Sequence, residues 1–226
     1  MGSLASTAVL GSLGVAALAV FVPVLWQWTQ YFSTFVHEAG HALVALLSGQ
    51  VLHAVEIFAN GGGCTTYSAG GGPFGELVNS LVGYVAPPAT ALGLIAALRH
   101  GVPARTVVLV LIFIAVLVLV VSGNAFGVAV MIAILLALAV VLHVAGPLAQ
   151  ATAAITAAWF LLLAGLRNIA VLYRVAGPGT GDDASAAAEV TGIPTVVWVS
   201  AFAAFAVYAV YQSGRWLLID PSGFLP

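Results

Sequence analysis

Long apolar runs constrain the fold of this chain more than any other feature of its sequence. A helix needs about 20 apolar residues to cross a bilayer, and charge rarely interrupts these runs, since 62% of the 226 residues are hydrophobic and 5% are charged. Helices also satisfy their own backbone hydrogen bonds, which lipid cannot do. We therefore expect an all-α polytopic membrane protein, embedded in the lipid bilayer as a single domain over residues 1–226. Seven spans are expected, with six or eight as alternatives, at residues 4–26, 29–47, 74–98, 107–121, 126–144, 147–173 and 194–211.

The charged and sulfur-containing residues exclude several classes of function. The net charge is −2 and the chain has no lysine, so it offers no basic patch and nucleic acid is excluded as a partner. Cys64 is the only cysteine, which excludes an internal disulfide and a cysteine-rich zinc site. Any zinc site in this chain would therefore be built from histidine and carboxylate ligands.

The strongest local motif is His37-Glu38-Ala39-Gly40-His41, which reads HExxH and lies in the expected span at residues 29–47. On a helix, residues four apart project from one face, so His37 and His41 can bind the same metal ion. Glu38 lies one step round the helix, close enough to act as a general base on a water at that metal. The small residues Ala39 and Gly40 are expected to leave room beside the metal for a substrate backbone.

A catalytic zinc ion takes three protein ligands and keeps one position for water, so the motif needs a third ligand. Asp182 and Asp183 are the leading candidates, because they stand in a polar, acidic loop at residues 176–193. The alternative is that one of them caps a short helix that follows. We favour Asp183 slightly as the metal ligand, with Asp182 as the other possibility.

The remaining acids and histidines have simpler expected positions. Glu56 is expected on a solvent-facing strand, with a role in the site as the alternative, and Glu76 suits the start of a helix. His143 is expected at a membrane interface, and His53 and His100 fall in a strand and a loop without an assigned role.

One segment lacks helical character. Residues 51–69 are rich in β-forming residues around the turn signal Asn60-Gly61-Gly62-Gly63, which predicts a β-hairpin. The edge of such a hairpin could hold an extended substrate by strand addition, or the hairpin could be a plain connector. In the next span, at residues 74–98, Gly83 and Pro87-Pro88 predict a kinked or broken helix.

Two asparagines interrupt apolar runs. Asn124 could contact a substrate carbonyl or orient the water at the metal, although a turn between two spans is the preferred interpretation. Asn168, next to Arg167 in the span at residues 147–173, is expected to face the interior of the helix bundle and to pair with a carboxylate.

The chain resembles the site-2 protease family of intramembrane zinc metalloproteases in three features. These are the motif on an early apolar helix, the glycine-rich hairpin after it, and the Gly/Pro-interrupted helix that follows. More narrowly, the chain is similar to a small bacterial branch called M50B-like. The segment Asp183-Ala184, followed by Glu189-Val190-Thr191-Gly192-Ile193-Pro194 and Trp198, is similar to a pattern of that branch.

The resemblance implies a multi-pass protein of the bacterial cell membrane that uses Zn²⁺ to cleave membrane-embedded or membrane-proximal peptide bonds of a membrane protein or peptide substrate. It implies that His37 and His41 are metal ligands and that Glu38 is catalytic. The third ligand of the family is an aspartate that glycine usually follows, whereas Ala184 follows Asp183 in this chain.

Two other functions compete with proteolysis. One is a membrane zinc hydrolase of another type, with the late glutamate Glu189 as third ligand. The other is a polytopic transporter or a non-catalytic metal-binding scaffold, in which the motif binds a metal or a proton without hydrolysis. The scarcity of polar residues in the other spans disfavours a transport path.

Overall fold

The fold is known from a computed structural model, which describes residues 2–68 and 70–219. In this part of the chain, eight α-helices and one two-stranded antiparallel sheet are present. The helices are α1 (Gly2–Phe21), α2 (Pro23–Leu47), α3 (Gly72–Arg99), α4 (Ala104–Val120), α5 (Ala125–Val144), α6 (Pro147–Val175), α7 (Asp183–Thr191) and α8 (Thr195–Gly214), which a π-helical turn, Arg215–Ile219, extends. The strands are β1 (Leu52–Ile57) and β2 (Gly63–Tyr67).

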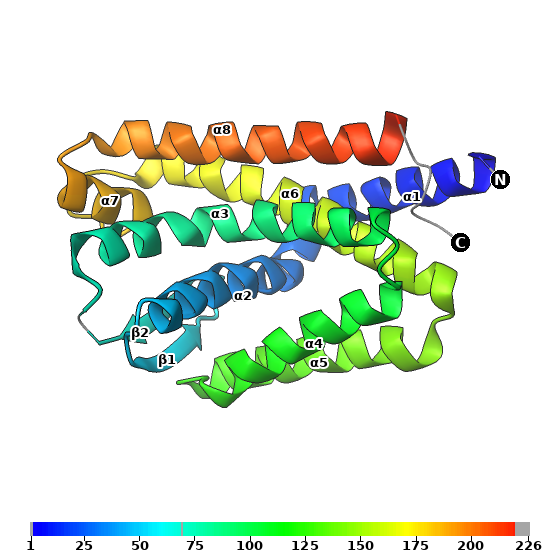
Figure 1. The fold of residues 1–226 in the computed structure, drawn as a ribbon, viewed down its shortest axis with the longest axis horizontal. Helices are drawn as coiled ribbons and strands as arrows, with labels where there is room; N and C mark the ends of the chain where they lie inside the picture. Colours follow the sequence, from blue (N-terminus) through cyan, green and yellow to red (C-terminus); the bar gives the residue numbers. More distant parts are fainter. Residues whose placement is uncertain (1, 69, 220–226) are drawn as a thin grey trace.

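The long helices run side by side around a central α6. Helix α6 packs against α1, α3 and α8, and α2 packs against α3 on the side of the α4–α5 pair. The short helix α7 and the β-hairpin lie at one end of this bundle, and the start of α1 and the end of α8 lie at the other (Figure 1). The hairpin, α7 and one end of α2 and α3 are thereby gathered at the same end of the molecule.

Helix α3 is continuous over all 28 residues with Pro87 and Pro88 inside it, so of the two expectations, a kinked or a broken helix, the break does not occur. Each proline removes one helical N–H, which leaves the carbonyls of Gly83 and Tyr84 without their usual partners. Both prolines are buried. A Cβ atom placed on Gly165 of α6 would lie 3.5 Å from the Pro88 ring, so α6 packs closely over this stretch. Neighbouring helices of this kind allow proline inside a helix within a membrane.

Among the described residues, four helices, or five spans if one bent pair counts as a single span, are long and apolar enough to cross a membrane, fewer than the seven expected or the alternatives of six or eight. Helices α3, α5, α6 and α8 with its extension are long and apolar enough to cross a bilayer. Helices α1 and α2 meet at an angle of 101° and count as one broken span at most, because Val22 is extended before Pro23. Helix α4 has only 17 residues. The expected spans are helical, but three of them are not long and apolar enough to count as separate spans.

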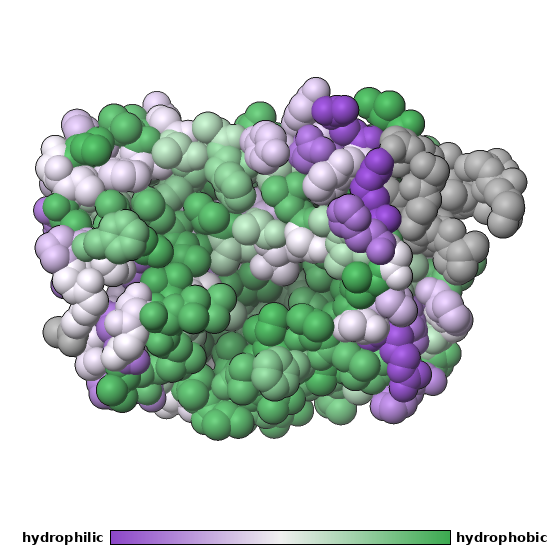
Figure 2. Space-filling model, viewed as in Figure 1, coloured by the Kyte–Doolittle hydropathy of each residue, from purple (hydrophilic) through white to green (hydrophobic). Residues whose placement is uncertain are grey.

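The surface is that of an integral membrane protein. Ile132, Leu136 and Val140 follow one another at four-residue intervals along α5 and are 45%, 63% and 58% exposed, forming an apolar stripe that water would not favour. Figure 2 shows a largely apolar face, with the most hydrophilic groups gathered toward the end where α1 begins. The chain is therefore a mostly α-helical, multi-pass membrane protein with a small β-hairpin.

The expected hairpin is present, and one of its two edges is already covered. In the register of the sheet, Glu56 lies opposite Cys64. On the outer side of β1, the Val55 N–H donates to the Val121 carbonyl and the Gly123 N–H donates to the Val55 carbonyl, both at 2.9 Å. Among the described residues, no strand covers the outer edge of β2.

Candidate metal centre

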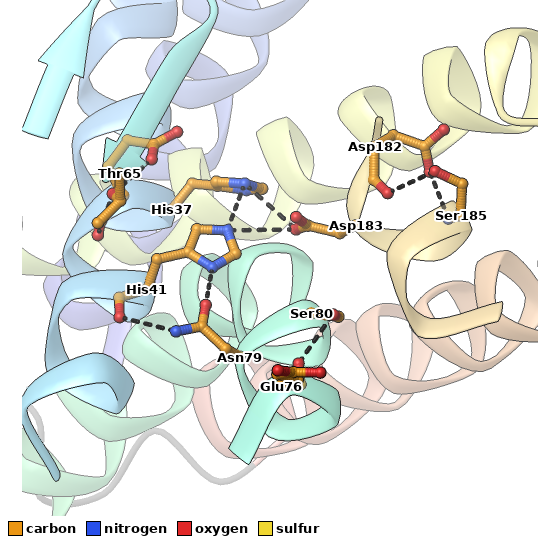
Figure 3. Close-up of polar contacts among 10 residues, drawn as sticks. His37, His41, Thr65, Glu76, Asn79, Ser80, Asp182, Asp183 and Ser185 are labelled. Atoms are coloured by element: carbon orange, nitrogen blue, oxygen red, sulfur yellow. Dashed lines mark hydrogen bonds and ion pairs between the residues drawn. The ribbon is translucent and has the colours of Figure 1, made fainter. Parts of the chain in front are cut away.

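Three potential metal ligands meet at the end of the bundle where α7 lies. His37 and His41 project from one face of α2, with their Nε2 atoms 3.2 Å apart. The Oδ2 atom of Asp183, on the first turn of α7, lies 3.4 Å from each of these nitrogens. Figure 3 shows the two imidazoles and the carboxylate pointing toward one another. In the described part of the chain, this is the one group of three such side chains close enough to share an ion.

The spacing of these atoms fits a tetrahedral metal ion. Zinc bonds of about 2.0–2.1 Å in tetrahedral geometry separate the ligand atoms by roughly 3.3 Å, close to the 3.2 and 3.4 Å measured here. The Asp183 Oδ2 atom is also buried and accepts no hydrogen bond, which is costly for a carboxylate oxygen. An ion between the three side chains would satisfy this oxygen and use the free electron pairs of both imidazoles.

The two adjacent aspartates are separated in space by the start of α7. Asp182 is the N-cap of this helix, and its carboxylate accepts a hydrogen bond from the Ser185 N–H at 2.9 Å and another from the Thr180 hydroxyl. The cap fixes the backbone so that Asp183, the first helical residue, faces the histidines. The structure therefore brings Asp183 to the imidazoles and gives the capping role to Asp182.

Asn79 of α3 orients one of the imidazoles, a role that was not predicted from the sequence. Its Oδ1 atom lies 2.7 Å from His41 Nδ1, and its Nδ2 donates to the His41 carbonyl at 3.4 Å. Because an amide oxygen only accepts, Nδ1 carries the imidazole proton and Nε2 keeps the electron pair that binds a metal. Partners of this kind fix both the tautomer and the orientation of a metal-binding histidine.

Gly83 leaves room for the three ligand atoms. A Cβ atom at this position would lie 2.5 Å from His37 Cε1 and nearer still to His41 Nε2 and Asp183 Oδ2. Gly83 lies four residues after Asn79 on the same face of α3, so one helix face supplies both the hydrogen bond and the space. Gly40 has a different role from the one expected, since its Cβ would lie 2.7 Å from Ala86. It brings α2 and α3 together and leaves no space there for a substrate.

Glu38 is held beside this cluster by the hairpin. Its side chain is only 4% exposed, and its carboxylate accepts a hydrogen bond of 2.7 Å from the Thr65 hydroxyl on β2. A Cβ on Gly63, at the start of β2, would lie 2.5 Å from Glu38 Oε1. The hairpin therefore positions the glutamate, which is a role beyond that of a plain connector.

A cavity of about 440 Å³ opens beside the cluster, and His37 and Glu38 are part of its wall. Tyr84 also lines it, with its ring edge-on to His37 at a centroid distance of 5.0 Å and stacked on Phe202 at 5.4 Å. Trp26, Arg167 and Asn168 lie on the wall as well. The cavity is large enough for a few residues of an extended chain.

Asn124 does not line this cavity. It caps α5 by accepting from the Gly127 N–H at 2.9 Å, and it donates to the Ile57 carbonyl of β1 at 2.8 Å. The preferred interpretation as a turn between two helices agrees with this position. Asn168 lies 3.3 Å from the Ser33 hydroxyl and donates to it, so its observed partner is a hydroxyl group and not the expected carboxylate.

The other acids and histidines considered from the sequence lie outside the cluster of potential ligands. Glu189, on the last turns of α7, is exposed, so the structure does not bring it to the histidines. Several of the others are also exposed at the surface, namely Glu76, His53, His100 and His143. Glu56 is half-buried on β1.

Comparison with known proteins gives one match. The model of a family described as Peptidase M50B-like matches residues 10–213. Neither a curated protein nor a solved structure is significantly similar to the chain. The match covers the elements that carry the cluster, from α2 to α7.

Proposed function

The chain belongs to the Peptidase M50B-like family, and we propose that it is an intramembrane zinc endopeptidase acting on membrane-embedded or membrane-proximal peptide bonds. One observation supports this most strongly. The potential ligands His37, His41 and Asp183 meet at tetrahedral spacing, and Glu38 lies beside them on the wall of the same cavity. This combination provides both a metal site and a base, which hydrolysis requires.

The metal ligands, Glu38 and Thr65 would have different roles in hydrolysis. A zinc ion held by His37, His41 and Asp183 would polarise the peptide carbonyl and make a neighbouring water more acidic. Glu38 accepts a proton from the attacking water as the new C–O bond forms. It then delivers that proton to the leaving amine nitrogen as the C–N bond breaks. Thr65 holds the Glu38 carboxylate in place by the hydrogen bond described above.

The substrate must be extended, because the peptide bonds of a helix are shielded by their own hydrogen bonds. The uncovered outer edge of β2 offers backbone groups for strand addition next to Glu38. We propose that this edge aligns the peptide with the cavity. The neighbouring Thr65 side chain ties that strand to Glu38, so binding and catalysis would share one element.

The proposed setting follows from the apolar surface and the family. Residues 1–226 would act as a single domain in a bacterial cell membrane, with another membrane protein or a membrane peptide as substrate. The third ligand proposed here is Asp183, and the cofactor is Zn²⁺.

Glu38→Gln tests the proposal. The variant keeps the size of the side chain and loses the base, so we expect bound zinc to stay at one ion per chain while cleavage falls by at least about 100-fold. The measurements are metal content by mass spectrometry and cleavage of a membrane-peptide library in detergent or nanodiscs. Glu76→Gln, an exposed glutamate on α3, is the matched control and should cleave like the wild type.

Two outcomes would contradict the proposal. Equal cleavage by the wild type and Glu38→Gln would remove Glu38 from the reaction. Zinc-dependent flux across liposomes without any cleavage would favour the transporter, the competing function.

A further inference from the structure

Arg167 is a positive charge in the interior of a membrane protein with no acidic partner among the described residues. It lies on α6 and is half-buried. Neither of the ion pairs that join His37 and His41 to Asp183 involves Arg167. An ionisable residue within a membrane-spanning helix is costly and usually faces a cavity or a partner. Arg167 faces a cavity, because it lines the one that also holds His37 and Glu38.

The neighbours of Arg167 occupy only part of its guanidinium group. One nitrogen donates to the Val20 carbonyl, which lies in the last turn of α1 and is near the break between α1 and α2. The Trp26 ring lies 4.4 Å from the Arg167 Cζ atom and covers one face of the planar group. A guanidinium carries five N–H donors in its plane, so these contacts leave donors without a partner among the described residues, on a residue that lines the cavity.

The chemistry of these free donors selects an anion with two oxygens. A guanidinium and a carboxylate form two parallel hydrogen bonds, and charge strengthens both. Stacking on Trp26 fixes the plane of the guanidinium group before a ligand arrives, which reduces the conformational entropy lost on binding. The same cavity is lined by Arg167 and by His37 and Glu38, so the anion would be part of the molecule being cleaved.

We propose that Arg167 binds a carboxylate of the peptide substrate, so that this protease selects peptides with an acidic group close to the cleaved bond. The inference rests on the proposed function. An extended chain advances about 3.3–3.6 Å per residue, and a compact cavity of 440 Å³ is roughly 9 Å across, so the acidic group lies within about three residues of that bond. It would be either an acidic side chain or the carboxyl terminus of the peptide.

Binding to an inactive protein tests the inference separately from catalysis. The protein is the full zinc-loaded chain carrying Glu38→Gln, and the probes are amidated apolar peptides with a single Glu or Gln scanned along the sequence. We expect at least one Glu position to bind about 10- to 100-fold more tightly than its Gln counterpart. A third set, without acidic side chains but with a free carboxyl terminus, distinguishes the two sources of the carboxylate.

Substitutions of Arg167 test whether this residue causes the preference for Glu-containing peptides. Adding Arg167→Gln should bring the Glu-to-Gln affinity ratio to about 1, and Arg167→Lys should restore part of it, because lysine keeps the charge and loses the guanidinium group. Arg174→Gln is the matched control, an exposed arginine at the end of the same helix, and should leave the ratio unchanged.

The inference fails if no probe with a carboxylate binds better than its neutral counterpart. It also fails if Arg167→Gln weakens all peptides equally, because Arg167 would then only support the bend between α1 and α2. Cleavage of neutral peptides by the wild type, lost in Glu38→Gln, would leave the proposed function intact in either case.

Discussion

At the scale of single residues, the candidate site depends on which of two neighbouring aspartates reaches the histidines. Asp182 uses its carboxylate to cap α7, with the Ser185 N–H and the Thr180 hydroxyl as donors. Asp183 then begins the helix and faces His37 and His41 at 3.4 Å. A negative charge at this position is also favoured by the N-terminal end of the α7 dipole.

Asp183→Ala and Asp182→Ala should therefore have different effects. We expect Asp183→Ala to lose bound zinc, because only two protein ligands remain. Asp182→Ala should retain zinc and lose about 1 kcal/mol of stability, the usual cost of an N-cap. Metal content and thermal unfolding of both variants check this, and full zinc occupancy in Asp183→Ala would remove that residue from the site.

Gly83→Ala is expected to lower zinc affinity, because the new methyl group would occupy the space between the three ligands. Gly93→Ala is the matched control on the same helix, where a Cβ atom meets nothing within 4 Å. Both changes favour helix formation, but the methyl group of Gly83→Ala also meets the three side chains in the metal-free protein, so zinc affinity and not the unfolding temperature is compared. Equal zinc affinities of the two variants, measured by competition with a chelator, would contradict the proposed position of the ion.

The sequence predicted the part of the site that one helix determines. His37 and His41 share a face because the helical repeat puts residues four apart in line. Asn79 and Gly83 have the same spacing, but their role depends on how closely α3 approaches α2, which no local pattern contains. A polar and a small residue four apart on an apolar helix was the available signal. The choice between Asp182 and Asp183 likewise depended on where α7 begins.

At the scale of elements, the hairpin packs closely against α2 at Glu38. Gly63 starts β2 directly against the Glu38 side chain, whereas a Cβ on Gly62 would meet only the Asn60 Oδ1 atom, at 3.3 Å. The strand must approach α2 this closely for the Thr65 hydroxyl to reach the Glu38 carboxylate. Packing between these two elements therefore sets the position of the Glu38 carboxylate.

Gly63→Ala should displace Glu38 and reduce cleavage by about 10-fold or more, since misplacing a catalytic group by about 1 Å can cost a factor of 100. Bound zinc should not change, because Gly63 does not contact the ligands. Gly62→Ala should cleave nearly as well as the wild type. If both variants keep full activity, the hairpin does not position the glutamate.

The type of each element was easier to predict than its continuity. Residues 51–69 were expected to form a hairpin because β-forming residues flank a glycine-rich turn, and β1 and β2 lie there. Pro87 and Pro88 suggested a kink or a break in α3, and the break does not occur, because packing against α6 stabilises the helix. The break between α1 and α2 falls at Val22 and Pro23, where a local proline rule alone could have placed it.

At the scale of the whole molecule, the candidate centre joins segments that are far apart in the sequence. Residues of α2 and α7 would share one ion, although Asp183 follows His41 by more than half of the chain. The apolar composition predicted the membrane setting, since it depends on averages over whole helices. The number of candidate membrane spans depended on the bend between α1 and α2 and on the length of α4. The average hydropathy of a segment contains neither.

Because an ion would bridge these distant helices, zinc should stabilise the folded protein as a whole. At free zinc 1,000 times above its dissociation constant, binding contributes about 4 kcal/mol. We expect a chelator to lower the unfolding temperature of the wild type by several degrees, and to have little effect on His41→Ala, which lacks a ligand. The shift is measured in detergent by differential scanning fluorimetry, and identical shifts in the two proteins would place the stabilising metal elsewhere.

The position of the ion tests the account most directly. Crystals of the zinc-loaded protein, measured on both sides of the zinc absorption edge, should show one anomalous peak about 2.0–2.1 Å from the Nε2 atoms of His37 and His41 and from a carboxylate oxygen of Asp183. A peak bound to the histidines without Asp183, or no peak between α2 and α7, would contradict it.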